Sequence, residues 1–195
     1  MAYFDSKLDL KSHISNICRT CHFQLRQLRT VRRSLQQEIL KTLLHAFVSC
    51  RLDCNYLFAG LPACGIAQLQ SVQNAAARLF GEVSKYDTVT PVLRDVLHWL
   101  PIKERINFKI GVLTYNALNA PSYLSEMLVP VAVNPALRRN ISADRGDLTV
   151  PRTKNTSYSD RSFAIVALML WNSFPVELRY CSSITFFQKT SDLFI

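Results

Sequence analysis

The feature that most constrains the fold is an apolar stripe at helical spacing near the N-terminus. Its members recur at steps of three and four residues: Ile14, Ile17, Cys21, Leu25 and Leu28. This spacing places them on one face of a helix, predicted over residues 10–33 with Asp9 in the N-cap position. Arginines repeat on another face of the same segment, so the helix is amphipathic and requires other elements to cover its apolar side.

Similar patterns predict a mainly α fold for the rest of the chain. A second helix is expected from Ser34, where Gln37 completes a capping box. Further helices are expected over residues 64–80, 91–98, 102–119 and 183–194, and around Phe163–Phe174. The residues expected to be buried in them are Leu40, Leu43 or Leu44, Phe47, Leu69, Val72, Ala76, Leu79, Ile102, Ile106, Ile110, Leu113, Ala117, Phe163, Val166, Leu170, Phe174, Ile184, Phe187 and Phe194.

Composition and the positions of proline and glycine divide the chain into four segments. Residues 1–82 are predicted to form an arginine-rich helical bundle, and residues 83–129 a helical connector. Prolines and Gly146 mark residues 130–157 as a loop or hinge, with one short extended piece around 147–152. Residues 158–195 are expected to form a smaller, mostly helical C-terminal module. We therefore expect at most one or two short strands in the whole chain.

The charge distribution favours a polyanionic partner. The net charge is +9, and residues 11–51 contain eight lysines and arginines but a single acid, Glu38. Such an excess is typical of nucleic-acid-binding surfaces, although it does not distinguish RNA from DNA. No stretch approaches the roughly 20 apolar residues of a membrane span, and the N-terminus lacks the apolar core of a secretory signal. We therefore expect a nuclear or cytoplasmic protein with no membrane partner.

The candidate nucleic-acid contacts lie on three predicted helices. On the first helix, arginines repeat every seven residues with others between them, so guanidinium groups can meet phosphates along one face. A second set of polar and basic residues lies on one flank of the helix at 64–80, and a third, basic set lies on one face of the helix at 102–119. The candidates are Arg19, Arg26, Arg29, Arg32, Arg33, Gln70, Asn74, Arg78, Lys103, Arg105 and Lys109. The alternative is an ordinary solvated helix face.

The six cysteines permit a second, weaker interpretation. Cys18 and Cys21 with two of Cys50, Cys54, His22 and His45 would give a loosely spaced zinc site. The preferred interpretation is that they are reduced thiols and that Cys18 and Cys21 pack as small apolar residues. The sequence has no glycine-rich phosphate loop, HExxH or GxSxG motif. We therefore predict no metal, no cofactor and no catalytic residue.

Several short strings follow one another in a characteristic order. They are Phe4–Leu8, His13–Ile14, Arg51–Asn55, Gly60–Pro62, Leu69–Leu79, Tyr86–Asp87, Thr90–Leu93, Leu97–Ile102, Arg105–Ile106, Ala120–Leu124, Val150–Thr153, Asp160–Phe163 and Leu170–Pro175. In this order they resemble the region that follows the polymerase palm in reverse transcriptases of LINE-type, or non-LTR, retrotransposons, including jockey-like elements, and the resemblance covers about residues 1–190. One departure is the tyrosine that the family usually has between the residues matching Asp53 and Cys54, which is absent here.

The resemblance implies a thumb over residues 1–82, which contacts template and primer, and a C-terminal module that handles RNA or target DNA. The aspartate pair that holds catalytic Mg²⁺ in the family's palm has no counterpart, so no catalytic residue is carried over. We expect a non-catalytic fragment of an RNA-directed DNA polymerase, from a 5′-truncated element, with the missing palm and fingers as its partner. The alternative is a helical protein-interaction fragment or a relic without activity.

Overall fold

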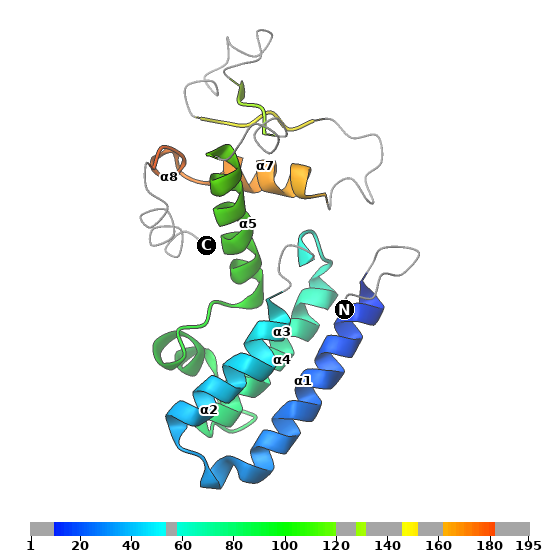
Figure 1. The fold of residues 1–195 in the computed structure, drawn as a ribbon, viewed down its shortest axis with the longest axis vertical. Helices are drawn as coiled ribbons and strands as arrows, with labels where there is room; N and C mark the ends of the chain where they lie inside the picture. The colour runs from blue at the N-terminus through cyan, green and yellow to red at the C-terminus, as the bar shows by residue number, and fades with distance from the viewer. Residues whose placement is uncertain (1–9, 54–57, 120–127, 132–145, 152–161, 182–195) are drawn as a thin grey trace. The chain divides into compact units, whose positions relative to one another are not determined.

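The computed structural model describes residues 10–53, 58–119, 128–131, 146–151 and 162–181 (Figure 1). Over these residues the fold is mainly helical, as predicted. Packing divides the chain into two compact units, residues 1–54 with 61–105 and residues 55–60 with 106–195. Helix α5 (Ile102–Leu118) contributes its first turn to the first unit and the rest to the second. This division reflects packing and differs in kind from the four segments predicted from composition, which remain predictions.

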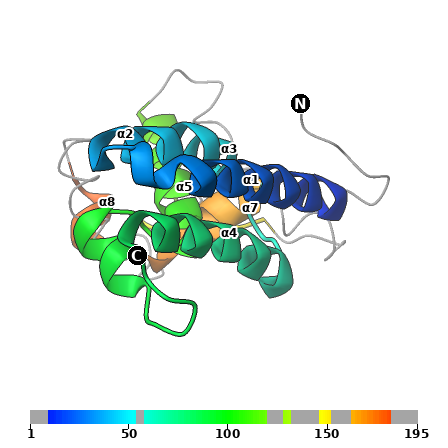
Figure 2. The same cartoon turned by 90° about the horizontal axis from the view of Figure 1, so that it is seen from below.

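The first unit is built from three helical rods. One is α1 (Lys11–Val31), followed by the short η1 (Arg32–Ser34). The second runs without a break through α2 (Gln37–Leu44), a π-helical turn η2 (His45–Ser49) and α3 (Cys50–Leu52). The third is α4 (Ala63–Gly81). Figures 1 and 2 show these rods packed against one another, with α1 lying along α4.

The apolar stripes predicted for α1 and α4 form the core of this unit. All five stripe residues of α1 are buried, and so are the four predicted for α4, among them Leu69 and Val72 with no exposed surface. The expected start of α1 changes, because its N-cap is Leu10 in a left-handed conformation with φ 59°. Asp9, the predicted cap, lies outside the described residues.

The second rod buries Leu40, Leu44, Val48 and Leu52, which follow one another at steps of four. In a regular α-helix each such step overshoots the turn by about 40°. The wider π turn offsets this drift, which keeps the stripe on one side and buries Val48 in place of the expected Phe47. The predicted capping box is wrong, since Ser34 belongs to η1 and the N-cap is Gln36.

A short π-helical segment, η4 (Val92–Val96), takes the place of the helix expected over residues 91–98. It packs against the end of α4, where Gly81 leaves no room for a side chain because a Cβ there would lie 2.9 Å from a methyl group of Val92. Glu82 follows in a left-handed conformation, φ 52°, and ends α4.

The second unit contains the remainder of α5, α7 (Phe163–Ser173) and α8 (Val176–Arg179), which was not predicted. On α5 the expected Ile106, Ile110 and Ala117 are buried, but Leu113 is exposed and Thr114 is buried in its place. The hydroxyl group of Thr114 donates to the carbonyl oxygen of Ile110, so its burial leaves no polar group unsatisfied.

The buried face of α7 differs from the predicted one. Ile165, Leu168 and Trp171 are buried, whereas the expected Phe163, Val166 and Leu170 are only partly covered. Because the segment is apolar on every side, periodicity alone cannot select its inner face. Leu168 and Trp171 pack with other buried residues from α5, α8, the end of α7 and two short segments: Tyr115, Ala117, Leu128, Leu148, Phe174 and Leu178.

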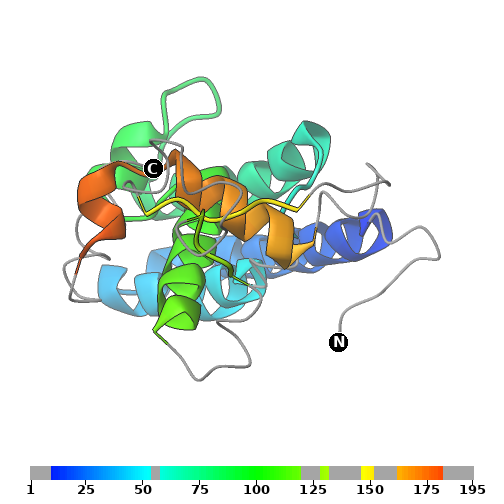
Figure 3. The same ribbon diagram turned by 90° about the horizontal axis from the view of Figure 1, so that it is seen from above.

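The extended piece expected around 147–152 is present at Leu148, which forms an antiparallel bridge with Pro130. Figures 1 and 3 show this segment beside α7. The amide side chain of Asn172 donates to the carbonyl oxygen of Leu148 and accepts from its N–H, at 2.9 and 2.8 Å. It therefore takes the place of a neighbouring strand. The helix predicted over residues 183–194 lies outside the described residues.

Candidate nucleic-acid interface

The exposed basic residues of α1 share one face of the helix. Successive positions on an α-helix are 100° apart, which places Lys11, Arg19, His22, Arg26 and Arg29 within an arc of about 80°. All five side chains are exposed. From first to last, the row is about 27 Å long, given a rise of 1.5 Å per residue. The arginines that the sequence places seven residues apart on α1, Arg19 and Arg26, therefore lie in one row of basic side chains.

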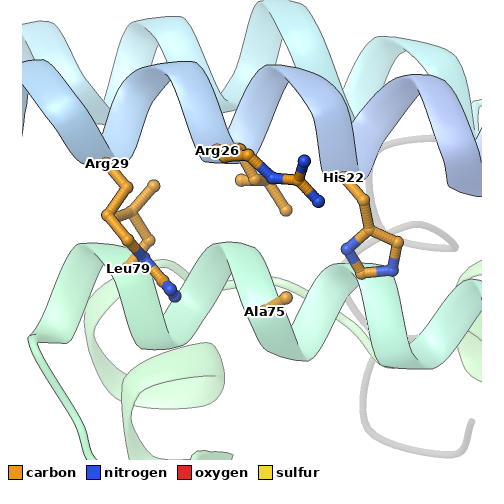
Figure 4. Close-up of a pocket in the computed structure, with 6 residues that line it drawn as sticks. His22, Arg26, Arg29, Ala75 and Leu79 are labelled. Carbon is orange, nitrogen blue, oxygen red and sulfur yellow. The ribbon is translucent and has the colours of Figure 1, made fainter.

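A groove opens between this row and α4. Its volume is about 240 Å³, and it is lined by His22, Leu25, Arg26, Arg29, Ala75 and Leu79. Figure 4 shows the side chains of His22 and Arg29 extending from α1 toward α4, which carries Ala75 and Leu79, while the Arg26 side chain lies in the gap along α1. The groove thus has a floor of aliphatic carbon and a rim of cationic and imidazole groups.

No acidic side chain offsets the charge of this face from within its two helices. Neither α1 nor α4 contains an aspartate or a glutamate. The acid closest in sequence to the end of α4, Glu82, forms an ion pair with Arg32 at 3.1 Å. Because Coulomb attraction to an anion falls with every neighbouring carboxylate, an acid-free pair of helices is a favourable surface for phosphate.

The structure separates two adjacent arginines of the predicted set. The Arg33 side chain is exposed in η1. That of Arg32 turns inward and donates to the carbonyl oxygens of Leu79 and Phe80, at 3.3 and 3.4 Å. These carbonyl groups belong to the last turn of α4, where helical hydrogen bonds run out. Arg32 therefore caps α4 and fastens α1 to it, which fixes the groove between them.

This difference predicts opposite phenotypes for two neighbouring substitutions. Arg32→Met is expected to lower the free energy of unfolding by about 1–2 kcal/mol, because two carbonyl groups lose a charged donor, and to leave the salt dependence of nucleic-acid binding unchanged. Arg33→Met is expected to leave stability unchanged and to make the slope of log K against log salt shallower by about 0.7–0.9. Urea titration by circular dichroism and binding by fluorescence anisotropy measure the two effects. A shallower slope for Arg32→Met at unchanged stability would reverse the assignment.

The predicted residues of α4 hold the chain that leads into α5. The side-chain oxygen of Gln70 accepts from the N–H of Ile102 at 2.8 Å, at the first residue of α5. Its amide nitrogen donates to Asn74 and to Gln73, and Gln73 in turn donates to the carbonyl oxygen of Leu100. Gln70 and Asn74 thus have partners within the protein. The remaining candidate on this flank, Arg78, is half-buried.

The candidates on α5 lie in different surroundings. Lys103 is exposed in the first turn. Arg105 forms an ion pair with Asp53 at 2.5 Å, which ties the start of α5 to the end of α3. Lys109 is half-buried and belongs to the second unit. Of the eleven predicted contacts, the structure brings Arg19, Arg26 and Arg29 together on one open face, with Arg33 directly after it.

The cysteines of the described part show no arrangement for a metal ion, since no three His, Cys, Asp or Glu side chains come close enough to share one there. Cys54 lies outside the described residues. Burial raises the pKa of the Cys21 thiol to about 11, and its Sγ donates weakly to the carbonyl oxygen of Phe47. A buried thiol of this kind behaves as a small core residue between α1 and the second rod.

Comparison of the chain with protein-family models, with curated protein sequences and with solved structures finds no match. None of the helices in the described segments has the length and hydropathy needed to cross a bilayer.

The groove was not predicted from the sequence, although parts of it were. Leu25 and Leu79 are members of predicted core stripes, and Arg26 and Arg29 were predicted contacts. His22 lies seven residues before Arg29 and four before Arg26, so helical spacing does place it on the same face. Ala75 carries no such signal, because only the packing of α4 on α1 makes it the floor of a groove.

Proposed function

We propose that this chain is the non-catalytic C-terminal part of a non-LTR retrotransposon reverse transcriptase and that it binds nucleic acid through the basic face of α1. The family is proposed on the ordered sequence strings, from Phe4–Leu8 to Leu170–Pro175. The observation that carries the binding function is the acid-free pair α1 and α4 with its exposed row of arginines. The proposal includes a nuclear or cytoplasmic location and no polymerase activity of the chain by itself.

Phosphate binding by this face is consistent with its chemistry. Arginine guanidinium groups fork onto phosphate oxygens and stay charged at any physiological pH. Four of them, at positions 19, 26, 29 and 33, would displace counterions from about four phosphates. Binding to a single strand is then expected to weaken by about fifty-fold between 50 and 200 mM salt.

The proposal is tested with the double variant Arg19→Gln, Arg26→Gln, which removes two charges and retains good helix formers. Its affinity for a labelled RNA hairpin or DNA duplex is expected to fall about 20-fold at 0.1 M salt, since two phosphate contacts are lost. Fluorescence anisotropy at several salt concentrations measures both affinity and slope. The slope is expected to become shallower by about 1.4–1.8.

A matched control separates the face from net charge. Lys85→Gln, Arg94→Gln removes the same two charges from exposed positions of the same unit that lie outside α1 and α4. We expect it to retain most of the affinity and the full slope. Equal losses in the two variants, or no binding by the folded wild-type chain, would contradict the proposal.

A helical protein-interaction fragment is the second candidate. It is favoured by large apolar side chains that are exposed on α1 and α2, where Phe23, Val31 and Ile39 each have about half of their surface open. Scattered apolar residues are common on protein surfaces, so this observation is weaker support for a function than the charge pattern is. Binding to a protein that is insensitive to salt and to the arginine substitutions would favour this alternative.

A further inference from the structure

We propose that the groove between α1 and α4 holds an unpaired base of a single-stranded nucleic acid, while Arg26 and Arg29 contact the phosphates beside it. The inference rests on the proposed function and adds the class of substrate: single strands in preference to duplex. It is carried by the lining of the groove, whose residues come from two helices that lie side by side (Figure 4).

The floor of the groove suits a flat, weakly hydrated ring. Leu25, Ala75 and Leu79 present aliphatic carbon, and removing the faces of a base from water against such carbon is favourable. A volume of about 240 Å³ lies below the range of about 300–1,000 Å³ for drug-sized ligands, so it suits one ring system and not a helix or a strand of protein.

The rim supplies the contacts that single strands use. Splayed bases stack on imidazole rings and on guanidinium planes. The groove offers the imidazole ring of His22 and the guanidinium groups of Arg26 and Arg29. The same arginines carry the charge that a flanking phosphate requires. In a duplex the bases are paired and stacked, so none of them is available to enter.

An acidic peptide is the other ligand that a basic groove attracts. Its carboxylates would satisfy the arginines, but the apolar floor would then lie beneath charged groups and remain without a partner of matching polarity. Charge on the rim with aliphatic carbon below it fits a nucleotide better, because a nucleotide has an anionic phosphate and an apolar ring face in one unit.

The test fills the floor of the groove without changing its charge. Ala75→Leu places a larger, helix-compatible side chain at the half-buried Ala75. The matched control is Ala67→Leu, the same change at an exposed position of α4 that does not line the groove. Probes are a short single-stranded oligoadenylate, an abasic oligomer of the same length, a blunt duplex and a polyglutamate competitor.

We expect the wild-type chain to bind oligoadenylate about five-fold or more tightly than the abasic oligomer. Ala75→Leu is expected to lose that preference and to bind the abasic oligomer and the duplex as the wild type does, while Ala67→Leu keeps the preference. The comparison with the abasic oligomer uses the wild-type chain alone, so it decides the question even if Ala75→Leu disturbs the helix.

The failures are distinguishable. Salt-dependent binding of duplex and abasic oligomer with no preference for bases would overturn this inference and leave the proposed function standing. The same holds if Ala75→Leu keeps the full preference, or if polyglutamate competes as well as oligoadenylate does. Absence of binding to every nucleic acid would overturn both.

Discussion

Replacing Arg179 with methionine is expected to destabilise the second unit by about 3–5 kcal/mol, the range for breaking one side of a buried ion pair. The Arg179 side chain is 7% exposed and forms an ion pair with Asp147. It also donates to the carbonyl oxygens of Phe174 and Asn172, both at 2.9 Å. The substitution leaves a carboxylate and two carbonyl groups without a charged donor, in a place that water reaches poorly.

The chain offers a specific probe for this prediction. It has two tryptophans, Trp99 in the first unit and Trp171 in the second. In a Trp99→Phe background, fluorescence reports on Trp171, which is 3% exposed and packs edge-on against Phe174. With a slope of about 2 kcal/mol per M urea, the midpoint is expected to fall by about 2 M.

Two controls belong with this measurement. Adding Asp147→Asn to Arg179→Met removes the orphaned charge and is expected to restore part of the lost stability, as a double-mutant cycle would show. Arg94→Met, at an exposed position, is expected to change stability by less than about 0.5 kcal/mol. A loss below about 1 kcal/mol for Arg179→Met would mean that the network contributes little.

Replacing Leu44 with alanine is the second change with a large expected effect, a loss of about 2–5 kcal/mol from the first unit. Leu44 ends α2 and has no exposed surface, and it belongs to the buried row that the π turn keeps aligned. The cost has two parts: the transfer of the lost methyl groups and the cavity they leave among α1, α4 and the second rod.

The neighbouring Leu43→Ala is the matched control. The sequence left open which of the two leucines is buried, and the structure places Leu44 inside and Leu43 at the margin. We expect Leu43→Ala to cost less than about half as much in urea denaturation followed by far-UV circular dichroism. Equal costs would indicate that the rod turns a different face inward.

The candidate site shows how far a sequence reaches toward a binding surface. The heptad arginines of α1 lie on one open face, because helical geometry alone places residues seven apart in line. Arg32 and Arg105 have the same chemistry, yet one caps α4 and the other pairs with Asp53. Their partners are 47 and 52 residues away, and no local pattern encodes such distances.

The string Leu170–Pro175 illustrates a second limit. In the structure, three residues of this string make contacts within the protein. Trp171 Nε1 donates to the carbonyl oxygen of Gly146, the side-chain amide of Asn172 donates to the carbonyl oxygen of Leu148, and Phe174 packs edge-on against Trp171. A motif that carries a resemblance to a family can therefore owe its residues to packing. The ion pair between Arg179 and Asp147 lies in the same part of the second unit.

By itself the sequence determined the mainly helical fold, the long helices α1, α4 and α5, the buried stripes of α1 and α4 and the basic face, because these depend on periodicity and on the local geometry of the helix. Only the tertiary structure decided which face of the apolar α7 is buried, which leucine of α2 is inside, and which basic residues have partners in the protein. It alone also formed the groove, since Ala75 and Leu79 meet His22, Arg26 and Arg29 only where α4 packs on α1. These features depend on contacts between residues far apart in the chain, and a single sequence carries no local signal of them.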